Sequence, residues 1–163
     1  MSMRSLLMIC IYLGFSFLQA QEFSAKVISV MDGNTFEIID PEKEKVKIML
    51  SMVDAPELGQ SFSEEAKAYA EKLLLKKKVT VEYQGKDFFG NKLAHITLKN
   101  GDEVHKLLLE QGLAMVMERK KDTELLAIQE KVKKEQIGLW ASDDIVTPWV
   151  FRRKQTMLQA KSR

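Results

Sequence analysis

Two carboxylates lie three residues apart in the segment Asp54-Ala55-Pro56-Glu57. Carboxylate oxygens are the ligands that hard cations such as Ca²⁺ prefer, and a glutamate within reach of a water molecule can act as its base. The same segment is also typical of an Asx-type turn that leads toward a helix. Asp32-Gly33-Asn34 is likewise a good turn sequence, although the Asn34 amide oxygen can also bind a cation. Taken alone, these residues fit a structural role as well as a chemical one.

Aromatic and histidine side chains offer fewer chemical roles. Phe88 and Phe89 precede Gly90 at the expected end of a strand, where they could stack on nucleic-acid bases. Two adjacent aromatic residues at such a place more often include one core residue, which is the interpretation we favour. Neither His95 nor His105 has a second histidine, cysteine or carboxylate at metal-ligand spacing, so we expect both to be structural.

The elements that must position these residues follow from hydrophobic spacing. Alternating apolar residues predict strands over 23–30, 34–39, 46–53, 79–83 and 93–98, and a short extended piece at 113–117. Helical spacing predicts helices over 63–76, 102–111 and 122–136, with Ser61 and Glu64 placed as a capping box for the first of them. Five strands interleaved with three helices predict an α+β domain built on a partly open, OB-type β-barrel.

Five sequence motifs occur together, in the same order and at the same spacing as in a known family. Their joint occurrence is far more specific than any single motif. They resemble the motifs of staphylococcal-nuclease-like (thermonuclease) domains and cover roughly residues 25 to 141. The resemblance implies the fold of that family and a calcium-dependent phosphodiesterase that cuts DNA or RNA. The motifs are Asp32-Gly33-Asn34-Thr35, Val53-Asp54-Ala55-Pro56-Glu57, Asp87-Phe88-Phe89-Gly90-Asn91-Lys92-Leu93-Ala94, Gln111-Gly112-Leu113-Ala114 and Ile137-Gly138-Leu139-Trp140.

The resemblance assigns roles to individual residues. Asp54, with the backbone carbonyl of Ala55, falls on a metal-binding position, and Glu57 falls on the general base. Asn34 takes the place of the second metal-binding aspartate, which removes one negative charge. We therefore expect Ca²⁺ binding to be weak or lost.

Both arginine positions of the family are substituted. Met49 stands at the first catalytic arginine and Asn91 at the second. Lys47 would point to the same face of its strand as Met49, but as a point charge without the bidentate fork of arginine. Lys92 would face the opposite side from Asn91. The resemblance also makes Phe88, Phe89 and Lys47 candidates for contact with nucleic acid.

The size of these losses predicts impaired catalysis. Removing one charge-stabilising donor costs about 10²–10³ in rate, and an arginine on a transferred phosphate is worth about 10³–10⁵. Although such effects are not additive, we expect the rate to be lower by about 10⁴ or more than that of an intact site. This expectation requires that no other guanidinium, such as that of Arg119 or Arg152, lies beside Asp54 and Glu57.

The first 20 residues differ from the rest of the chain. Arg4, an apolar stretch at 6–18 and a small residue at Ala20 predict a signal peptide cleaved after Ala20, hence an exported protein, secreted or periplasmic. The alternative is a retained N-terminal anchor, because Leu18 is larger than the residue such cleavage sites usually carry. Cys10 is the single cysteine and lies in this segment, so the mature chain would have no disulfide. No later stretch is long enough to cross a membrane. The family domain is expected over 21–141, and the extension over 142–163 is either a helix or a loose tail.

Composition leaves three functions open. The chain has 163 residues and a net charge of +2, so its overall charge attracts a polyanion only weakly, and we expect a monomer. The leading hypothesis is a nuclease-like domain with weak or absent catalysis that binds nucleic acid or a protein partner. The second is a slow exported nuclease that uses Asp54, Glu57 and Lys47. The third is a protein-binding module without affinity for nucleic acid.

Overall fold

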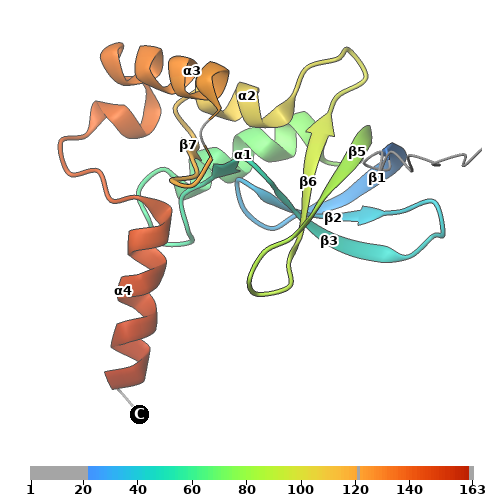
Figure 1. Ribbon diagram of the computed structural model, residues 1–163, viewed down its shortest axis with the longest axis horizontal. Coiled ribbons are helices and arrows are strands. Elements are labelled where there is room, and N and C mark those ends of the chain that lie inside the picture. Colours follow the sequence, from blue (N-terminus) through green and yellow to red (C-terminus); the bar gives the residue numbers. More distant parts are fainter. Residues whose placement is uncertain (1–21, 121, 162–163) are drawn as a thin grey trace, which may run out of the picture.

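The computed structural model describes residues 22–120 and 122–161 (Figure 1). The predicted signal peptide at 1–20 lies outside the described residues. Five strands form a closed barrel in the order β1-β2-β3-β6-β5, in which β3 and β6 are parallel and the other neighbours antiparallel. The predicted α+β fold with a five-stranded barrel is confirmed, and the barrel is closed rather than partly open. Its strands are β1 (Glu22–Val30), β2 (Thr35–Ile39), β3 (Lys45–Leu50), β5 (Lys78–Lys86) and β6 (Lys92–Thr97).

The strand expected over 46–53 is two strands. The chain leaves the barrel after β3 and forms β4 (Val53–Asp54), which pairs with β7 (Met115–Val116) from the piece expected at 113–117. Between β3 and β4, the Ser51 amide donates to Ala94 at 3.1 Å, and Met52 accepts from the Met117 amide at 3.1 Å. This break moves Asp54 from the barrel wall onto a separate two-stranded sheet.

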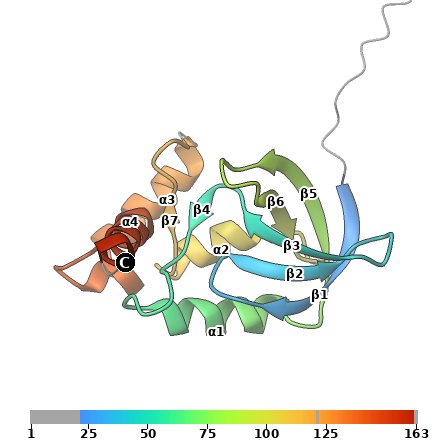
Figure 2. The ribbon, with the colours of Figure 1, turned by 90° about the horizontal axis from the view of Figure 1, so that it is seen from below.

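Four α-helices accompany the barrel: α1 (Ser63–Leu74), α2 (Val104–Glu110), α3 (Thr123–Lys134) and α4 (Pro148–Lys161). A 3₁₀ turn, η1 (Gly138–Ala141), follows α3. The three expected helices are confirmed with shorter ends, and the extension beyond 141 contains a fourth. Figure 1 shows α4 projecting from the body that the barrel and the other helices form, and Figure 2 looks along α4 from its free end. No helix within 22–120 and 122–161 has the length and hydropathy of a membrane span.

The capping box predicted for α1 is wrong. Phe62 is the N-cap residue with a left-handed φ of 66°, and no side chain caps the helix. The free Ser63 backbone amide donates instead to the Gln60 carbonyl at 3.1 Å, and the first hydrogen bond of the helix joins the Ala66 amide to the Phe62 carbonyl at 3.0 Å. A turn of the preceding loop therefore begins the helix.

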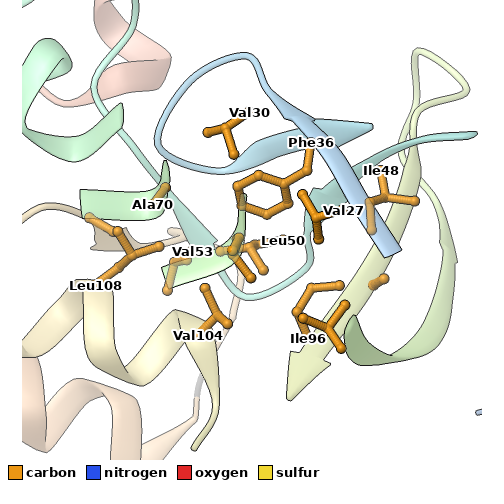
Figure 3. Close-up of a cluster of buried hydrophobic side chains, with 14 of the residues drawn as sticks. Val27, Val30, Phe36, Ile48, Leu50, Val53, Ala70, Ile96, Val104 and Leu108 are labelled. Atoms are coloured by element: carbon orange, nitrogen blue, oxygen red, sulfur yellow. The ribbon is translucent and has the colours of Figure 1, made fainter. Parts of the chain in front are cut away.

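The core fills the barrel and continues beneath α1 and α2. Phe36 is fully buried among residues that alternate along the strands, including Val27, Ile48 and Leu50 (Figure 3). A register shift in β1 between Val27 and Ser29 turns Val30 inward as well. Each such side chain stabilises the fold by about 1.5–3 kcal/mol. The barrel is thus a firm support for the loops at its rim.

Candidate functional site

Gly33 brings the first motif against the second. A Cβ at Gly33 would lie 2.7 Å from the Ala55 Cβ and 2.8 Å from the Ala66 Cβ, so only glycine fits between this loop, the Asp54 segment and α1. The Asp32 carboxylate accepts a hydrogen bond from the backbone amide of Asn34 at 2.9 Å and so stabilises the turn. This packing places Asn34 beside Asp54.

Asn34 is 3% exposed, and both its side-chain nitrogen and its side-chain oxygen form hydrogen bonds. Its side-chain amide nitrogen donates to Asp54 Oδ1 at 3.3 Å and to the Val53 carbonyl at 3.4 Å. Its amide oxygen accepts from the Thr35 hydroxyl at 3.3 Å. The residue therefore presents hydrogen-bond donors, rather than its oxygen, to the Asp54 carboxylate.

Asp54 and Glu57 differ strongly in burial. The Asp54 side chain is 3% exposed and that of Glu57 is 33% exposed. The loop after Glu57 is held by Gln60, whose amide oxygen accepts from the Glu57 backbone amide at 3.1 Å. The amide nitrogen of Gln60 donates to the Val146 carbonyl, which ties this loop to the segment before α4.

Arg152 of α4 binds both carboxylates. Its Nη2 donates to Asp54 Oδ2 at 2.6 Å and its Nη1 to Asp54 Oδ1 at 3.1 Å, while Nη1 also donates to Glu57 Oε1. Burial lowers the pKa of Arg152, but the hydrogen bonds and charges of Asp54 and Glu57 outweigh it and raise the pKa above its ordinary value. Arg152 therefore stays charged and compensates the buried Asp54.

The expectation that no other guanidinium lies beside Asp54 and Glu57 is wrong. Arg152 and Asp54 are 98 residues apart along the chain, so no local sequence spacing connects them. The one sequence signal for Arg152 was the basic, amphipathic character of the extension. Arg119, the other arginine considered, makes no ion pair with either carboxylate within the described residues.

Met49 and Asn91, which the motif resemblance places at arginine positions, lie on β3 and directly before β6. Met49 is half-buried and pairs with Thr35 of β2 and Leu93 of β6. Lys47 is exposed on the same strand and, with Lys45, Lys92 and Asn91, lines a hollow of about 280 Å³. The Lys92 ammonium lies 5.5 Å from the centre of the Tyr83 ring. Three lysines thus gather beside Asn91.

Phe88 and Phe89 lie at the tip of the loop between β5 and β6. They are 96% and 85% exposed, and their rings meet edge to face with centroids 5.5 Å apart. The interpretation that one of them is a core residue is wrong, because the loop reaches beyond the barrel and leaves neither ring a surface to pack on. The pair is available for contact with a ligand.

The two histidines lie beside each other. His105 is buried and its Nε2 lies 3.0 Å from Glu103, while His95 Nδ1 lies 3.5 Å from Glu82. Their ring centroids are 5.3 Å apart. No set of three metal-ligating side chains includes them within the described residues.

Comparison with known proteins decides the family. The sequence model described as "Staphylococcal nuclease homologue" matches residues 47–142. The chain is also 31% identical over 135 residues to an "Uncharacterized endonuclease" of Escherichia coli O157:H7, covering 82% of this chain and 88% of that protein. The chain belongs to the staphylococcal nuclease family. The family resemblance expected from the five motifs is confirmed.

More distant members extend the match. An "Uncharacterized endonuclease" of Haemophilus influenzae is 27% identical over 161 residues, which is 96% of this chain and 90% of that protein. A "Micrococcal nuclease" of Shigella flexneri is 22% identical over 143 residues, covering 81% and 82% of the two chains.

Calcium, on which the staphylococcal nuclease family generally depends, does not fit the residues as they are arranged. Both oxygens of Asp54 accept hydrogen bonds from Arg152, and Asn34 turns its amide nitrogen toward the same carboxylate. Ca²⁺ requires six to eight oxygen ligands. Within 22–120 and 122–161, no group of three acidic, histidine or cysteine side chains is placed to hold an ion.

The predicted site residues form two groups. The first group lies around Arg152 and consists of Asn34, Asp54, Ala55 and Glu57. The second group lies on β3 and on the loop between β5 and β6, and consists of Lys47, Phe88, Phe89 and Asn91. Within the described residues, no hydrogen bond or ion pair joins one group to the other. The first group is an ion-pair cluster, and the second combines exposed rings with lysines.

Proposed function

We propose that this chain is an exported, monomeric member of the staphylococcal nuclease family that binds nucleic acid and cleaves it slowly or not at all. The observation that carries the proposal is the pair of exposed rings, Phe88 and Phe89, on the loop that leads into the lysine-lined hollow. Aromatic rings next to cations are the usual means of holding single-stranded nucleic acid, because bases stack on the rings and phosphates meet the cations.

The lysines supply attraction without the geometry of a phosphodiesterase. Lys45, Lys47 and Lys92 are point charges, whereas arginine holds a phosphate through two parallel hydrogen bonds. Met49 offers no hydrogen-bond donor, and the Asn91 side chain donates to Asp87 at 2.7 Å. The lysine-lined hollow therefore suits binding of a nucleic-acid backbone better than stabilisation of the transition state of its cleavage.

The case for slow cleavage changes with Arg152. A simple shortage of guanidinium groups no longer describes the site, since Arg152 lies on Asp54 and Glu57. It lies on the acids themselves, however, and so occupies the oxygens that a cation and an attacking water would need. We infer slow cleavage from this occupation together with the substitutions at 49 and 91.

A slow nuclease is the second candidate, and one feature of Arg152 favours it. Three of the five N–H groups of the guanidinium point to Asp54 and Glu57, which leaves the edge formed by Nε and the second hydrogen of Nη2. That edge could hold a phosphate oxygen pair, with Lys47 as a further charge. This candidate requires that Glu57→Gln abolishes cleavage.

Titration of a labelled single-stranded oligonucleotide tests the binding proposal. Affinity should fall steeply between about 50 and about 200 mM salt, as it does where phosphates release counterions. Replacing Lys45 and Lys47 by glutamine should lower the salt slope by about one per lysine. Lys131 and Lys134 are also exposed and make no ion pair within the described residues, so the same change there is the control. Negligible affinity without salt dependence would instead support the protein-binding alternative.

A further inference from the structure

The Asp54 carboxylate has no free oxygen for a cation. Oδ2 accepts from Arg152 Nη2 at 2.6 Å, and Oδ1 accepts from both Arg152 Nη1 and Asn34 Nδ2, at 3.1 and 3.3 Å. Glu57 is bound to the same Nη1. A guanidinium aims its hydrogens at the lone pairs through which a metal ion would be coordinated. A divalent cation and Arg152 therefore exclude one another at these oxygens.

A buried carboxylate needs one of these partners. The Asp54 side chain is 3% exposed, and an unpaired charge at such a depth is strongly unfavourable. Asn34 alone contributes a single neutral donor to it. The guanidinium thus supplies the positive charge that a family member with a metal ion would draw from the metal.

Helix α4 is attached in a way that allows it to leave. Residues 152–161 are all exposed, including Met157 at 63% and Leu158 at 64%. The first turn of α4 packs on the body, since Pro148 is buried and Phe151 borders a cavity with Phe62. Beyond that turn, Arg152 joins the helix to the body by ion pairs with Asp54 and Glu57.

The segment before the helix suits such a movement. Residues 142–147 have no regular secondary structure, and 142–144 are exposed. Gln60 holds the Val146 carbonyl at the base of the helix. A rotation of α4 about its packed first turn would therefore move Arg152 off the carboxylates without loss of buried apolar surface by residues 152–161, which are exposed.

We propose that α4 is an internal occupant of the carboxylate site, in which Arg152 binds Asp54 and Glu57 in place of a divalent cation and so keeps the site closed. In the closed form the Arg152 guanidinium is bound to Asp54 and Glu57, and in the open form it has left both carboxylates. A divalent cation at high concentration shifts the protein to the open form, because it binds only there. The proposal does not depend on nucleic-acid binding.

Two variants at neighbouring positions test this directly. Arg152→Gln removes the occupying charge, whereas Arg153→Gln removes an equal charge from an exposed residue that makes no ion pair within the described residues. Calcium binding is measured by calorimetry on the purified protein without nucleic acid. Arg152→Gln should bind Ca²⁺ between about 5-fold and about 150-fold more tightly than the wild type, the usual range of such couplings. Arg153→Gln should match the wild type.

Amide hydrogen exchange gives an independent reading. In Arg152→Gln, the amides of 150–161 should exchange faster than in the wild type, with the barrel unchanged. High Ca²⁺ should have the same local effect on the wild type, a measurement that holds even where Arg152→Gln fails to fold. Equal Ca²⁺ affinity of the wild type and a folded Arg152→Gln, or exchange in α4 that neither the variant nor Ca²⁺ alters, would overturn the proposal. Loss of oligonucleotide binding would leave these results untouched.

Discussion

Asn91 donates its side-chain amide to the Asp87 carboxylate at 2.7 Å and closes the loop that carries Phe88 and Phe89. The backbone amides of Asn91 and Phe89 donate to the other oxygen of Asp87, at 2.8 and 2.9 Å. Partial burial raises the pKa of Asp87, but these hydrogen bonds outweigh it and hold the pKa below its ordinary value. Asn91, which the motif resemblance places at an arginine position, therefore has a structural role in this loop.

Restoring the family residues should restore cleavage. Asn34→Asp, Met49→Arg and Asn91→Arg, combined with Arg152→Gln to free the carboxylates, should raise the rate of oligonucleotide digestion with calcium by about 10² or more. The matched control adds Glu57→Gln, which should abolish the gain. A folded variant that is no faster than the wild type would show that the substitutions are not what limits the site.

Removing the exposed rings should weaken binding without affecting the fold. Phe88→Ser with Phe89→Ser should cost about 1–3 kcal/mol for each stacked base in oligonucleotide affinity. The melting temperature should stay unchanged, because the two rings are 96% and 85% exposed. Leu158→Ser on α4, which is 64% exposed, is the control for loss of an exposed apolar side chain. Unchanged affinity would remove this loop from the interface.

Gly112 should not tolerate a side chain. It has a φ of +62°, and a Cβ there would lie 2.2 Å from the Ile137 carbonyl oxygen, so Gly112→Ala should lower the free energy of unfolding by about 3 kcal/mol or more. Gly59 has a φ of +82° but no atom within 4 Å of such a Cβ, so Gly59→Ala should cost only about 1–2 kcal/mol of backbone strain. Chemical denaturation of both variants makes the comparison, and equal losses would contradict the packing argument.

Acidification should destabilise the fold through His105. Burial lowers the pKa of His105, and His95 and Lys106 lower it further, against the opposing effect of Glu103. Because its pKa is lower in the folded than in the unfolded state, the stabilisation is full above about pH 6.5 and is lost as the pH falls through the folded-state value. The free energy of unfolding should decrease as the pH is lowered through this range, and the decrease should be smaller in His105→Gln. An identical slope in that variant would exclude His105 as the cause.

Sequence spacing predicted the barrel because each core strand alternates. Phe36 and Ile38 on β2, and Val46, Ile48 and Leu50 on β3, are buried where the alternation places them. The break between β3 and β4 was not predictable in this way, since apolar residues continue through Met52 and Val53. Only the backbone hydrogen bonds of Ser51 and Met52 show that the chain leaves the barrel there.

The candidate site was predictable where a local motif carries it. Asn34, Asp54 and Glu57 lie together because Gly33 and the β4–β7 pair bring their loops into contact. Arg152 lies outside the five motifs, and its position depends on how α4 packs rather than on neighbouring residues. The exposure of both Phe88 and Phe89 depends on how far the β5–β6 loop extends, which spacing alone does not determine.

Digestion of an oligonucleotide by the wild-type protein tests the central claim most directly. With micromolar protein and calcium, we predict that the oligonucleotide is bound in a salt-dependent manner and remains intact, or is cut about 10²-fold or more below the rate of an intact family member. Turnover comparable to that of an intact member, abolished by Glu57→Gln, would contradict the account.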